Sequence, residues 1–273
     1  LAARSLERSL LVDSQVPSAW REVFSAWSLL WVLAVEEYYR FSADDDWLRR
    51  IYPAVAEQGR RCEGLLTAQG LMRIEADNML DWAPMDTPRD GIVTHVNAWL
   101  AEAYRRTAVM ARHLNYQHEA RHAEELAERV TAAINHTLWD EARQAYVDSL
   151  HADGTPSVVV SQQTNLVVLL CHAVPPARQA AIRRLIVNPP AGIVRAGSPF
   201  AMFFILEALA GMGEHDLMLA LIRHWWGMMI DRDASTCWET FPGFEPAGRW
   251  TRSHCHAWSA APTYFLTRCQ LGI

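Results

Sequence analysis

Apolar residues recur at spacings of three and four along most of this chain, and this period constrains the fold more than any other feature. The first such series consists of Trp20, Phe24, Trp27, Leu30, Trp31 and Ala34. It predicts one helix from about Ser18 to Phe41. Asp44-Asp45-Asp46 then supplies an N-terminal cap and a favourable negative charge for a second helix, Trp47 to Gln69, which stops at Gly70. Two helices joined by a short acidic turn form an antiparallel hairpin.

The same unit recurs farther along the chain with a different sequence. The period predicts helix pairs at 92–114 with 118–138, 161–174 with 177–187 and 200–212 with 216–230, and a last helix at about 257–269. Long irregular stretches separate the hairpins, at 71–91, 139–160, 188–199 and 231–256, and segments 71–74 and 146–149 could add brief strands. When helical hairpins stack around an axis, the short turns collect at one end and the long loops at the other. The long-loop end is then the natural place for a binding site.

Several of these helices are apolar on more than one side, as at 27–35 and 201–209. Such helices suit an inner ring that is covered by an outer ring. A solenoid of stacked hairpins is the alternative, but no repeat motif of a known solenoid family supports it. We therefore expect an all-α toroid of helical hairpins, with short β segments in its long loops, as a single domain over residues 1–273. Residues 1–11 lack an initiator Met and read as an amphipathic helix entered midway, so we expect a fragment of a longer protein.

Charge and cysteine usage exclude several classes of partner. The net charge is −6, with 31 acidic and 25 basic side chains, and no basic block is longer than a pair, so we expect no nucleic-acid partner. The longest apolar run, 27–35, is too short to cross a bilayer, and we expect no membrane partner. The five cysteines are scattered, odd in number and without a CxxC motif. They predict reduced thiols and, with no signal peptide in the chain, a cytoplasmic location. The oligomeric state stays open.

The candidate functional residues lie in the last long loop. Trp238 and Glu239 stand among small polar residues, and His254 and His256 follow at the start of the next predicted helix. Sugar sites are commonly built this way. An aromatic face stacks on the apolar side of a pyranose ring, while a carboxylate either accepts hydrogen bonds from the sugar hydroxyls or moves a proton. The twelve Trp in the chain also suit a carbohydrate-handling protein. The alternative is a Glu on a solvated loop beside a core Trp.

Asp81-Trp82 repeats the acid-and-indole pairing in another long loop. Alternatively, Asp81 caps local backbone amides, Trp27 is a core residue on its helical stripe, and His256 is satisfied by a backbone group. His254-Cys255-His256 has no second ligand cluster nearby, so we expect no metal site and no cofactor. Phosphate-binding glycine loops, GxSxG elbows and HExxH motifs are absent from the sequence.

Six segments together carry a resemblance to a known family over essentially the whole chain. They are Ser28-Leu29-Leu30-Trp31-Val32-Leu33, Asp81-Trp82, Leu138-Trp139-Asp140 with Tyr146-Val147-Asp148-Ser149, Ser161-Gln162-Gln163-Thr164-Asn165, Thr236-Cys237-Trp238-Glu239-Thr240, and His256-Ala257-Trp258-Ser259 with Pro262-Thr263-Tyr264-Phe265-Leu266. In this order they resemble the C-terminal part of the catalytic domain of bacterial α-L-rhamnosidases (glycoside hydrolase family 78). These are inverting glycoside hydrolases with an (α/α)6 toroid.

The resemblance implies a role for each candidate residue. Glu239 would be the general base on the attacking water, His256 would line the sugar subsite, and Trp27 and Trp82 would wall in the rhamnose with Asp81 beside Trp82. Trp238 would lie against the sugar next to the base. The substrate implied is a rhamnosyl glycoside with a terminal α-linked L-rhamnose.

The general acid of that family sits in an Asp-x-x-x-Glu-Arg motif on an earlier hairpin, and this chain contains no match to it. We therefore expect the acid to precede Leu1, the toroid to be incomplete at its N-terminus, and the isolated chain to have little or no hydrolase activity. Two alternatives remain open. One is an α/α-toroid glycosidase with a different sugar specificity, and the other is a non-catalytic helical scaffold or sugar-binding module.

Overall fold

Four antiparallel helix pairs and one further α-helix make up about half of the described residues. The computed structural model describes residues 1–20 and 22–272. The pairs are α1 (Ser25–Ser42) with α2 (Asp45–Glu63), α3 (Thr94–His113) with α4 (Gln117–Thr137), α5 (Gln162–Leu170) with α6 (Pro176–Val187), and α7 (Pro199–Met212) with α8 (His215–Ile230), followed by α9 (Ala261–Leu266). These bounds confirm the predicted hairpins.

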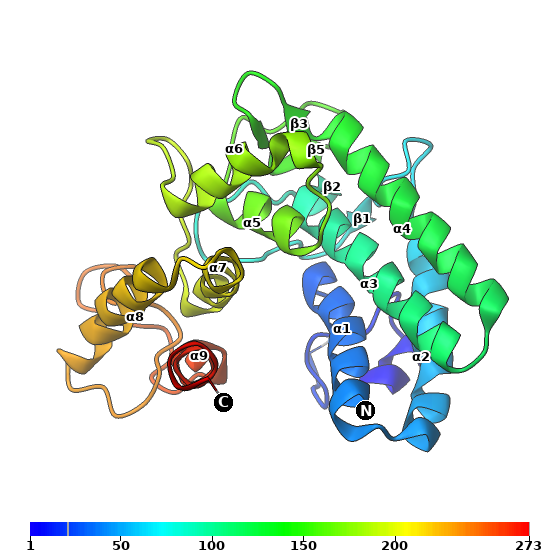
Figure 1. Cartoon of the computed structure of the whole chain (residues 1–273), viewed down its shortest axis with the longest axis horizontal. Helices are drawn as coiled ribbons and strands as arrows, with labels where there is room; N and C mark the ends of the chain where they lie inside the picture. The colour runs from blue at the N-terminus through cyan, green and yellow to red at the C-terminus, as the bar shows by residue number, and fades with distance from the viewer. Residues whose placement is uncertain (21, 273) are drawn as a thin grey trace.

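The odd-numbered helices form the inner layer of a curved double layer. Along the chain α1 packs on α3, α3 on α5, α5 on α7 and α7 on α9, while α2, α4, α6 and α8 lie outside them (Figure 1). In α3 the side chains are buried on nearly every side from Thr94 to Tyr104, as an inner helix requires. The predicted all-α toroid is confirmed.

Short polar signals start these helices where the sequence predicts. The Asp44 carboxylate accepts a hydrogen bond from the Trp47 amide at 2.8 Å, and so caps α2. The hydroxyls of Ser161 and Ser198 do the same for α5 and α7, accepting from the Thr164 and Ala201 amides at 3.1 and 3.3 Å. The serine caps fix the entry of the two inner helices that border the site described below.

Two predicted boundaries are wrong, each because a contact made elsewhere in the chain competes with the helix. α1 begins at Ser25 rather than Ser18, since Phe24 is extended and the Ser25 amide donates to the Asp77 carbonyl at 3.1 Å. Arg21, within the predicted first turns, lies outside the described residues. α2 ends at Glu63 rather than Gln69. The Thr67 amide donates to the carbonyl of Leu71, which lies later in the chain, at 2.9 Å, and so does not continue the helix.

The last predicted helix is divided into three short pieces. A 3₁₀ turn at Ala257–Ser259 precedes α9, and a π-helical turn at Thr267–Leu271 follows it. At the other end of the chain, the predicted amphipathic segment forms a 3₁₀ helix at Ala2–Glu7. Short helices of this kind depend on tertiary contacts for their stability.

Short strands lie in the long loops. β1 (Ile74–Glu75), β2 (Asp90–Val93) and β5 (Ser149–His151) form an antiparallel sheet in the order β1-β2-β5, and β3 (Trp139–Asp140) pairs with β4 (Ala145–Tyr146). The predicted strand segments 71–74 and 146–149 overlap three of these strands. β3 was not predicted, and neither was β2. At its centre a Cβ on Gly91 would lie 2.7 Å from the Leu150 carbonyl oxygen, so the close approach of β2 to β5 requires glycine.

The long loops all precede inner helices, and the short turns all follow them. Turns of a few residues join α1 to α2, α3 to α4, α5 to α6 and α7 to α8, whereas long segments lead into α3, α5, α7 and α9. The N-terminal ends of the inner helices therefore share one end of the molecule with the long loops. This is the end at which the sequence places Trp27, Asp81, Glu239 and His256.

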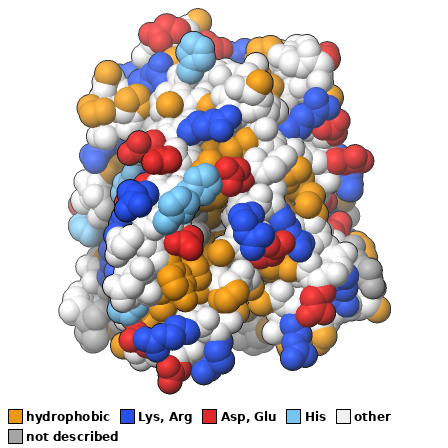
Figure 2. Space-filling model, turned by 90° about the vertical axis from the view of Figure 1, so that its right-hand side faces the viewer, with side chains coloured by type: hydrophobic (Ala, Val, Ile, Leu, Met, Phe, Trp, Pro, Cys, Tyr) orange, Lys and Arg blue, Asp and Glu red, His pale blue; other side chains and the backbone are white. Residues whose placement is uncertain are grey.

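The outer surface is of mixed charge. Acidic and basic side chains are interspersed over the face shown in Figure 2, without an extended area of one sign. Neighbouring charges are paired, as in Arg61 Nε to Glu57 Oε1 and Arg73 Nη2 to Asp90 Oδ2, each at 2.6 Å. Among the described residues, no helix has the length and apolar character that crossing a membrane would require.

Candidate active site

Glu239 and His256 are brought together by two loop segments that are joined by hydrogen bonds. The Glu239 amide donates to the Ser253 carbonyl, and the His256 amide donates to the Cys237 carbonyl, both at 2.9 Å. One residue beyond Glu239, the Thr240 amide donates to the Thr251 hydroxyl at 3.1 Å. The two ends of the loop 241–250 therefore lie close together. This brings Glu239 near His256, although they are 17 positions apart in the sequence.

The carboxylate of Glu239 is largely shielded from water but is not consumed by a strong partner. Its side chain is 13% exposed, and its Oε2 lies 3.7 Å from Nδ1 of His256. That distance allows an electrostatic attraction to a protonated imidazole but exceeds a normal hydrogen bond. A carboxylate in this state keeps lone pairs with which it can accept a proton from a bound water or hydroxyl.

The side chain of Trp238, the residue before Glu239, is buried. Its ring is 4% exposed and packs against His254 at 5.2 Å and Trp250 at 5.9 Å between ring centroids. Trp238 thus supports the segment, and its predicted contact with a sugar stays a prediction.

An aromatic row leads from His256 to the first inner helix. The imidazole of His256 lies 4.4 Å from the Trp258 ring, Trp258 stacks on Phe200 at 5.2 Å, and Phe200 stacks on Trp27 at 5.0 Å. Trp27 and Phe200 come from the first turns of α1 and α7, and all three stacked rings are only partly buried. Partly exposed, nearly parallel rings beside a carboxylate suit the apolar faces of a sugar.

Trp258 and Phe200 were not among the predicted site residues. The signal for Phe200 was its place directly after the Ser198-Pro199 helix start, and the signal for Trp258 was its place two residues after His256. Neither signal shows that the two rings meet, because they lie 58 positions apart in the sequence.

The carboxylate of Asp81 joins its own loop to α5 and to the segment before α7. It is 6% exposed; its Oδ1 accepts from the Trp82 amide at 2.8 Å, and its Oδ2 accepts from Gln163 Nε2 at 2.7 Å and from the Gly197 amide at 2.8 Å. Burial raises the pKa of Asp81, while the donors from Gly197, Ser198, Gln163 and Trp82 act against that rise. The carboxylate is therefore occupied as an acceptor. Its predicted role beside the sugar stays a prediction.

Trp82 is connected to the Glu239 segment through Arg252. The guanidinium carbon of Arg252 lies 3.9 Å above the centre of the Trp82 ring, and Arg252 Nε donates to Glu245 at 2.9 Å. The next residue, Ser253, supplies the carbonyl that holds the Glu239 amide. One face of the Trp82 ring is thus covered by a cation, a contact that the sequence did not predict.

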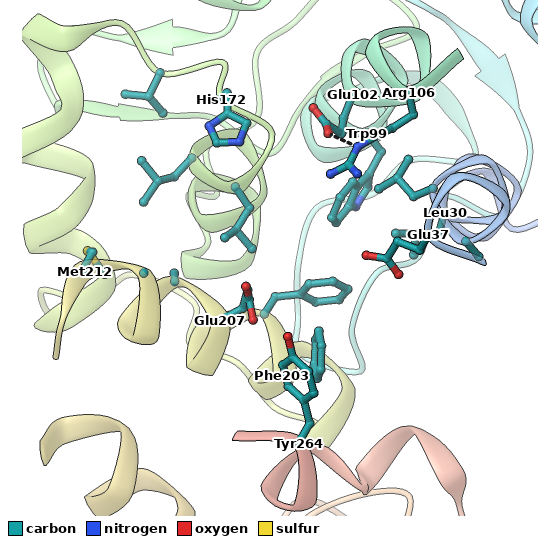
Figure 3. Close-up of a pocket in the computed structure, with 18 of the residues that line it drawn as sticks. Leu30, Glu37, Trp99, Glu102, Arg106, His172, Phe203, Glu207, Met212 and Tyr264 are labelled. Atoms are coloured by element: carbon teal, nitrogen blue, oxygen red, sulfur yellow. Dashed lines mark hydrogen bonds and ion pairs between the residues drawn. The ribbon is translucent and has the colours of Figure 1, made fainter. Parts of the chain in front are cut away.

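A large cavity lies elsewhere in the ring. It has a volume of about 690 Å³ and is lined by the middle and C-terminal parts of α1, α3 and α7, including Trp99, Phe203 and Tyr264 of α9 (Figure 3). Two carboxylates that line it are held in ion pairs, Glu102 with Arg106 at 2.7 Å and Arg105 at 3.2 Å, and Glu207 with Arg268 at 3.0 Å. Since these arginines already hold the two carboxylates, we place the candidate active site at Glu239 instead.

Metal-ligating side chains are dispersed. In the part of the chain that the structure describes, no three His, Cys, Asp or Glu side chains are grouped to hold a metal ion, and all five cysteines are free thiols.

Comparisons with known proteins place the chain in a family. The family model described as the bacterial alpha-L-rhamnosidase 6 hairpin glycosidase domain matches residues 5–269. A search of the curated proteins gives no match. Among solved structures, the GH78 family rhamnosidase of Bacillus sp. GL1 is 41% identical, with a TM-score of 0.94 over 97% of this chain and 28% of that one.

More distant structures share the fold. A rhamnosidase from Klebsiella oxytoca, solved with rhamnose bound, is 23% identical with a TM-score of 0.78, over 97% of this chain and 51% of that chain. A GH63 mannosylglycerate hydrolase from Thermus thermophilus is 18% identical with a TM-score of 0.64, over 88% and 75% of the two chains. The chain therefore spans between about a quarter and a half of the length of these two rhamnosidases. The match over residues 5–269 and the identity of 41% together show that this chain belongs to the bacterial α-L-rhamnosidase six-hairpin glycosidase family.

Proposed function

We propose that the protein carrying this domain hydrolyses terminal α-L-rhamnosides with inversion at the anomeric carbon, and that Glu239 is the general base. The observation that carries the proposal is the state of the Glu239 carboxylate. It is 13% exposed, held next to His256, and adjacent to the row formed by Trp258, Phe200 and Trp27.

The base would remove a proton from water as the water attacks the anomeric carbon. Among the described residues, the only ion-pair partner of this carboxylate is the His256 imidazole, at 3.7 Å, so the carboxylate can take up that proton without first breaking a strong ion pair. The aromatic row would lie against the apolar ring face and the methyl group of the deoxy sugar, while His256 and Glu239 meet its polar edge. Trp82, held under Arg252, would bound the other side of the sugar.

An inverting mechanism requires a second carboxyl group about 6.5–9.5 Å from the first, which protonates the leaving oxygen on the opposite face of the ring. We propose that this general acid comes from outside residues 1–273, since the sequence contains no acidic motif of the expected Asp-x-x-x-Glu-Arg kind. The isolated chain would then bind a sugar weakly and turn it over poorly.

The test is hydrolysis of an aryl α-L-rhamnoside by the full protein and by its Glu239→Gln variant. We expect kcat to fall by about 10²–10⁴-fold with little change in KM, because the amide still fits but removes no proton. Glu128→Gln, an exposed glutamate on α4, is the control and should behave as wild type. Proton NMR of the first product should show the anomer opposite to that of the substrate.

A panel of aryl glycosides of other sugars decides specificity. Faster hydrolysis of a glucoside or mannoside than of the rhamnoside would replace the substrate in this proposal. Unchanged turnover in Glu239→Gln would remove the proposed base, and binding of sugar without hydrolysis by the full protein would favour a sugar-binding module.

A further inference from the structure

Three successive backbone carbonyls, those of residues 237–239, accept hydrogen bonds from His256 and from the turn that follows it. The Cys237 carbonyl accepts from the His256 amide at 2.9 Å, the Trp238 carbonyl from the Ser259 hydroxyl at 2.6 Å, and the Glu239 carbonyl from the Trp258 indole Nε1 at 3.0 Å. On its other side the Glu239 amide is held by Ser253. The peptide units on both sides of the Glu239 Cα are therefore restrained.

Trp258 is the member of this set that also touches the second functional side chain. Its ring lies 4.4 Å from the His256 imidazole, and Nδ1 of that imidazole lies 3.7 Å from the Glu239 carboxylate. One side chain thus contacts the residue on each side of the 3.7 Å gap. Its opposite neighbour is Phe200, at 5.2 Å and 29° between ring planes, which connects it to α7 and, through Trp27, to α1.

The turn itself is anchored from the outer layer. Trp226 of α8 donates from Nε1 to the Ser259 carbonyl at 2.8 Å, and both residues are buried. Trp258 is therefore attached to a rigid support on one side and to two inner helices on the other. A side chain held in this way can fix the orientation of the residues that it contacts, whereas a side chain on a free loop cannot.

We propose that Trp258 is a positioning residue for the reaction, and that it orients Glu239 through the indole N–H and His256 through ring contact. This inference rests on the proposed role of Glu239 as base. If a polar hydrogen bond from the indole defines where the carboxylate points, its loss should slow the proton transfer more than it weakens substrate binding.

Two replacements of Trp258 isolate the N–H group. Trp258→Phe retains an aromatic ring and removes the donor. Benzothienylalanine at position 258 retains the two-ring shape and has sulfur in place of the N–H, so it guards against loss of folding through a smaller ring. Trp47→Phe is the matched control, because Trp47 lies on α2 and packs on Tyr38 at 4.4 Å, away from the Glu239 segment.

Two measurements follow from the proposal. In the full protein, we expect both position-258 replacements to lower kcat for an aryl α-L-rhamnoside by about 10–100-fold with KM within about threefold. In the chain of 273 residues, we expect hydrogen exchange of the Glu239 and His256 amides to accelerate by about tenfold or more, with Trp47→Phe unchanged in both assays.

Each contrary result has a defined meaning. A rise in KM with kcat retained would leave Trp258 as a substrate contact alone and would overturn the positioning role. Wild-type kinetics and wild-type exchange in both replacements would overturn it as well. If the full protein hydrolyses no rhamnoside, or if Glu239→Gln is fully active, the proposed function fails, and hydrogen exchange alone then decides whether the indole holds the segment.

Discussion

The carboxylate oxygen Oε2 of Glu239 lies 3.7 Å from Nδ1 of His256, a close approach that exceeds a normal hydrogen bond. The two side chains come from segments joined by backbone bonds on both sides, so the gap is set by the fold and not by the rotamers alone. A gap of this size leaves room for a hydroxyl group or a water to bridge the two residues. The pair therefore offers one proton acceptor and one polar group that can hold a ligand in place.

From this geometry we predict that His256→Ala mainly weakens substrate binding. The Glu239 carboxylate remains as the base, while a polar contact and the ring against Trp258 are lost. In the full protein we expect KM for an aryl α-L-rhamnoside to rise by about tenfold, equivalent to about 1.4 kcal/mol of binding, and kcat to change less. His118→Ala, on the exposed start of α4, serves as the control. A fall in kcat as large as that of Glu239→Gln would mean that His256 takes part in the chemistry.

Asp81→Asn is predicted to destabilise the fold. Oδ2 accepts from both Gln163 and Gly197, and Oδ1 accepts from the Trp82 amide. However the new amide rotates, at least one N–H donor then faces an NH₂ group. Leaving a buried donor unsatisfied costs about 1–3 kcal/mol, which urea unfolding of the chain would measure. Asp231→Asn, exposed at the end of α8, should change stability little, and equal stabilities of the two variants would contradict the assignment of Asp81 as an acceptor for three donors.

The bond from Gly197 to Asp81 is predicted to depend on the absence of a side chain at position 197. A Cβ there would lie 2.3 Å from Cε2 of Phe244 and 3.2 Å from the Cβ of Ala83. Gly197→Ala should therefore displace Phe244 and destabilise the chain by about 1–3 kcal/mol in urea unfolding. Gly211→Ala is the matched control, because nothing lies within 4 Å of its added Cβ and it stands inside α7, where alanine is favoured by about 0.5–1 kcal/mol. Stabilisation by both substitutions would refute the close packing at Gly197.

The sequence predicted the hairpins because their signals are local. Asp44 caps α2 three residues before the amide it accepts from, and the period of three and four is present within each helix. The start of α1 was missed because the partner that holds Ser25 is Asp77, and no local pattern indicates it. The division of the final helix was missed for the same reason, since Ser259 and Trp258 bond to the segment around Glu239 instead of continuing a regular helix.

The residues of the candidate site were likewise predicted where their signals are local and missed where they are not. Glu239, Trp238 and His256 were predicted from their order in two short motifs, and the structure brings Glu239 and His256 together. Phe200 and Arg252 were missed because their contacts with Trp258 and Trp82 join residues 58 and 170 positions apart. Tertiary contacts at such separations depend on how hairpins pack around the ring, which periodicity and capping do not determine.

Acid sensitivity of the fold is predicted to depend on His95 in the first turn of α3. The side chain is fully buried, and burial lowers the pKa of His95 to about 3. In the unfolded chain the pKa is about 6.5, so the unfolded state binds the proton first as the pH falls. The stability that depends on neutral His95 is therefore complete above about pH 6.5 and is lost as the pH falls toward 3. The loss at pH 4 amounts to about 3 kcal/mol.

Glutamine at position 95 does not titrate, so His95→Gln tests this prediction. Urea unfolding should show a smaller difference in the free energy of unfolding between pH 7 and pH 4 than in the wild type. His136→Gln, exposed near the end of α4, should retain the wild-type difference. Parallel pH dependence in all three proteins would show that His95 is not the group that takes up the proton on unfolding.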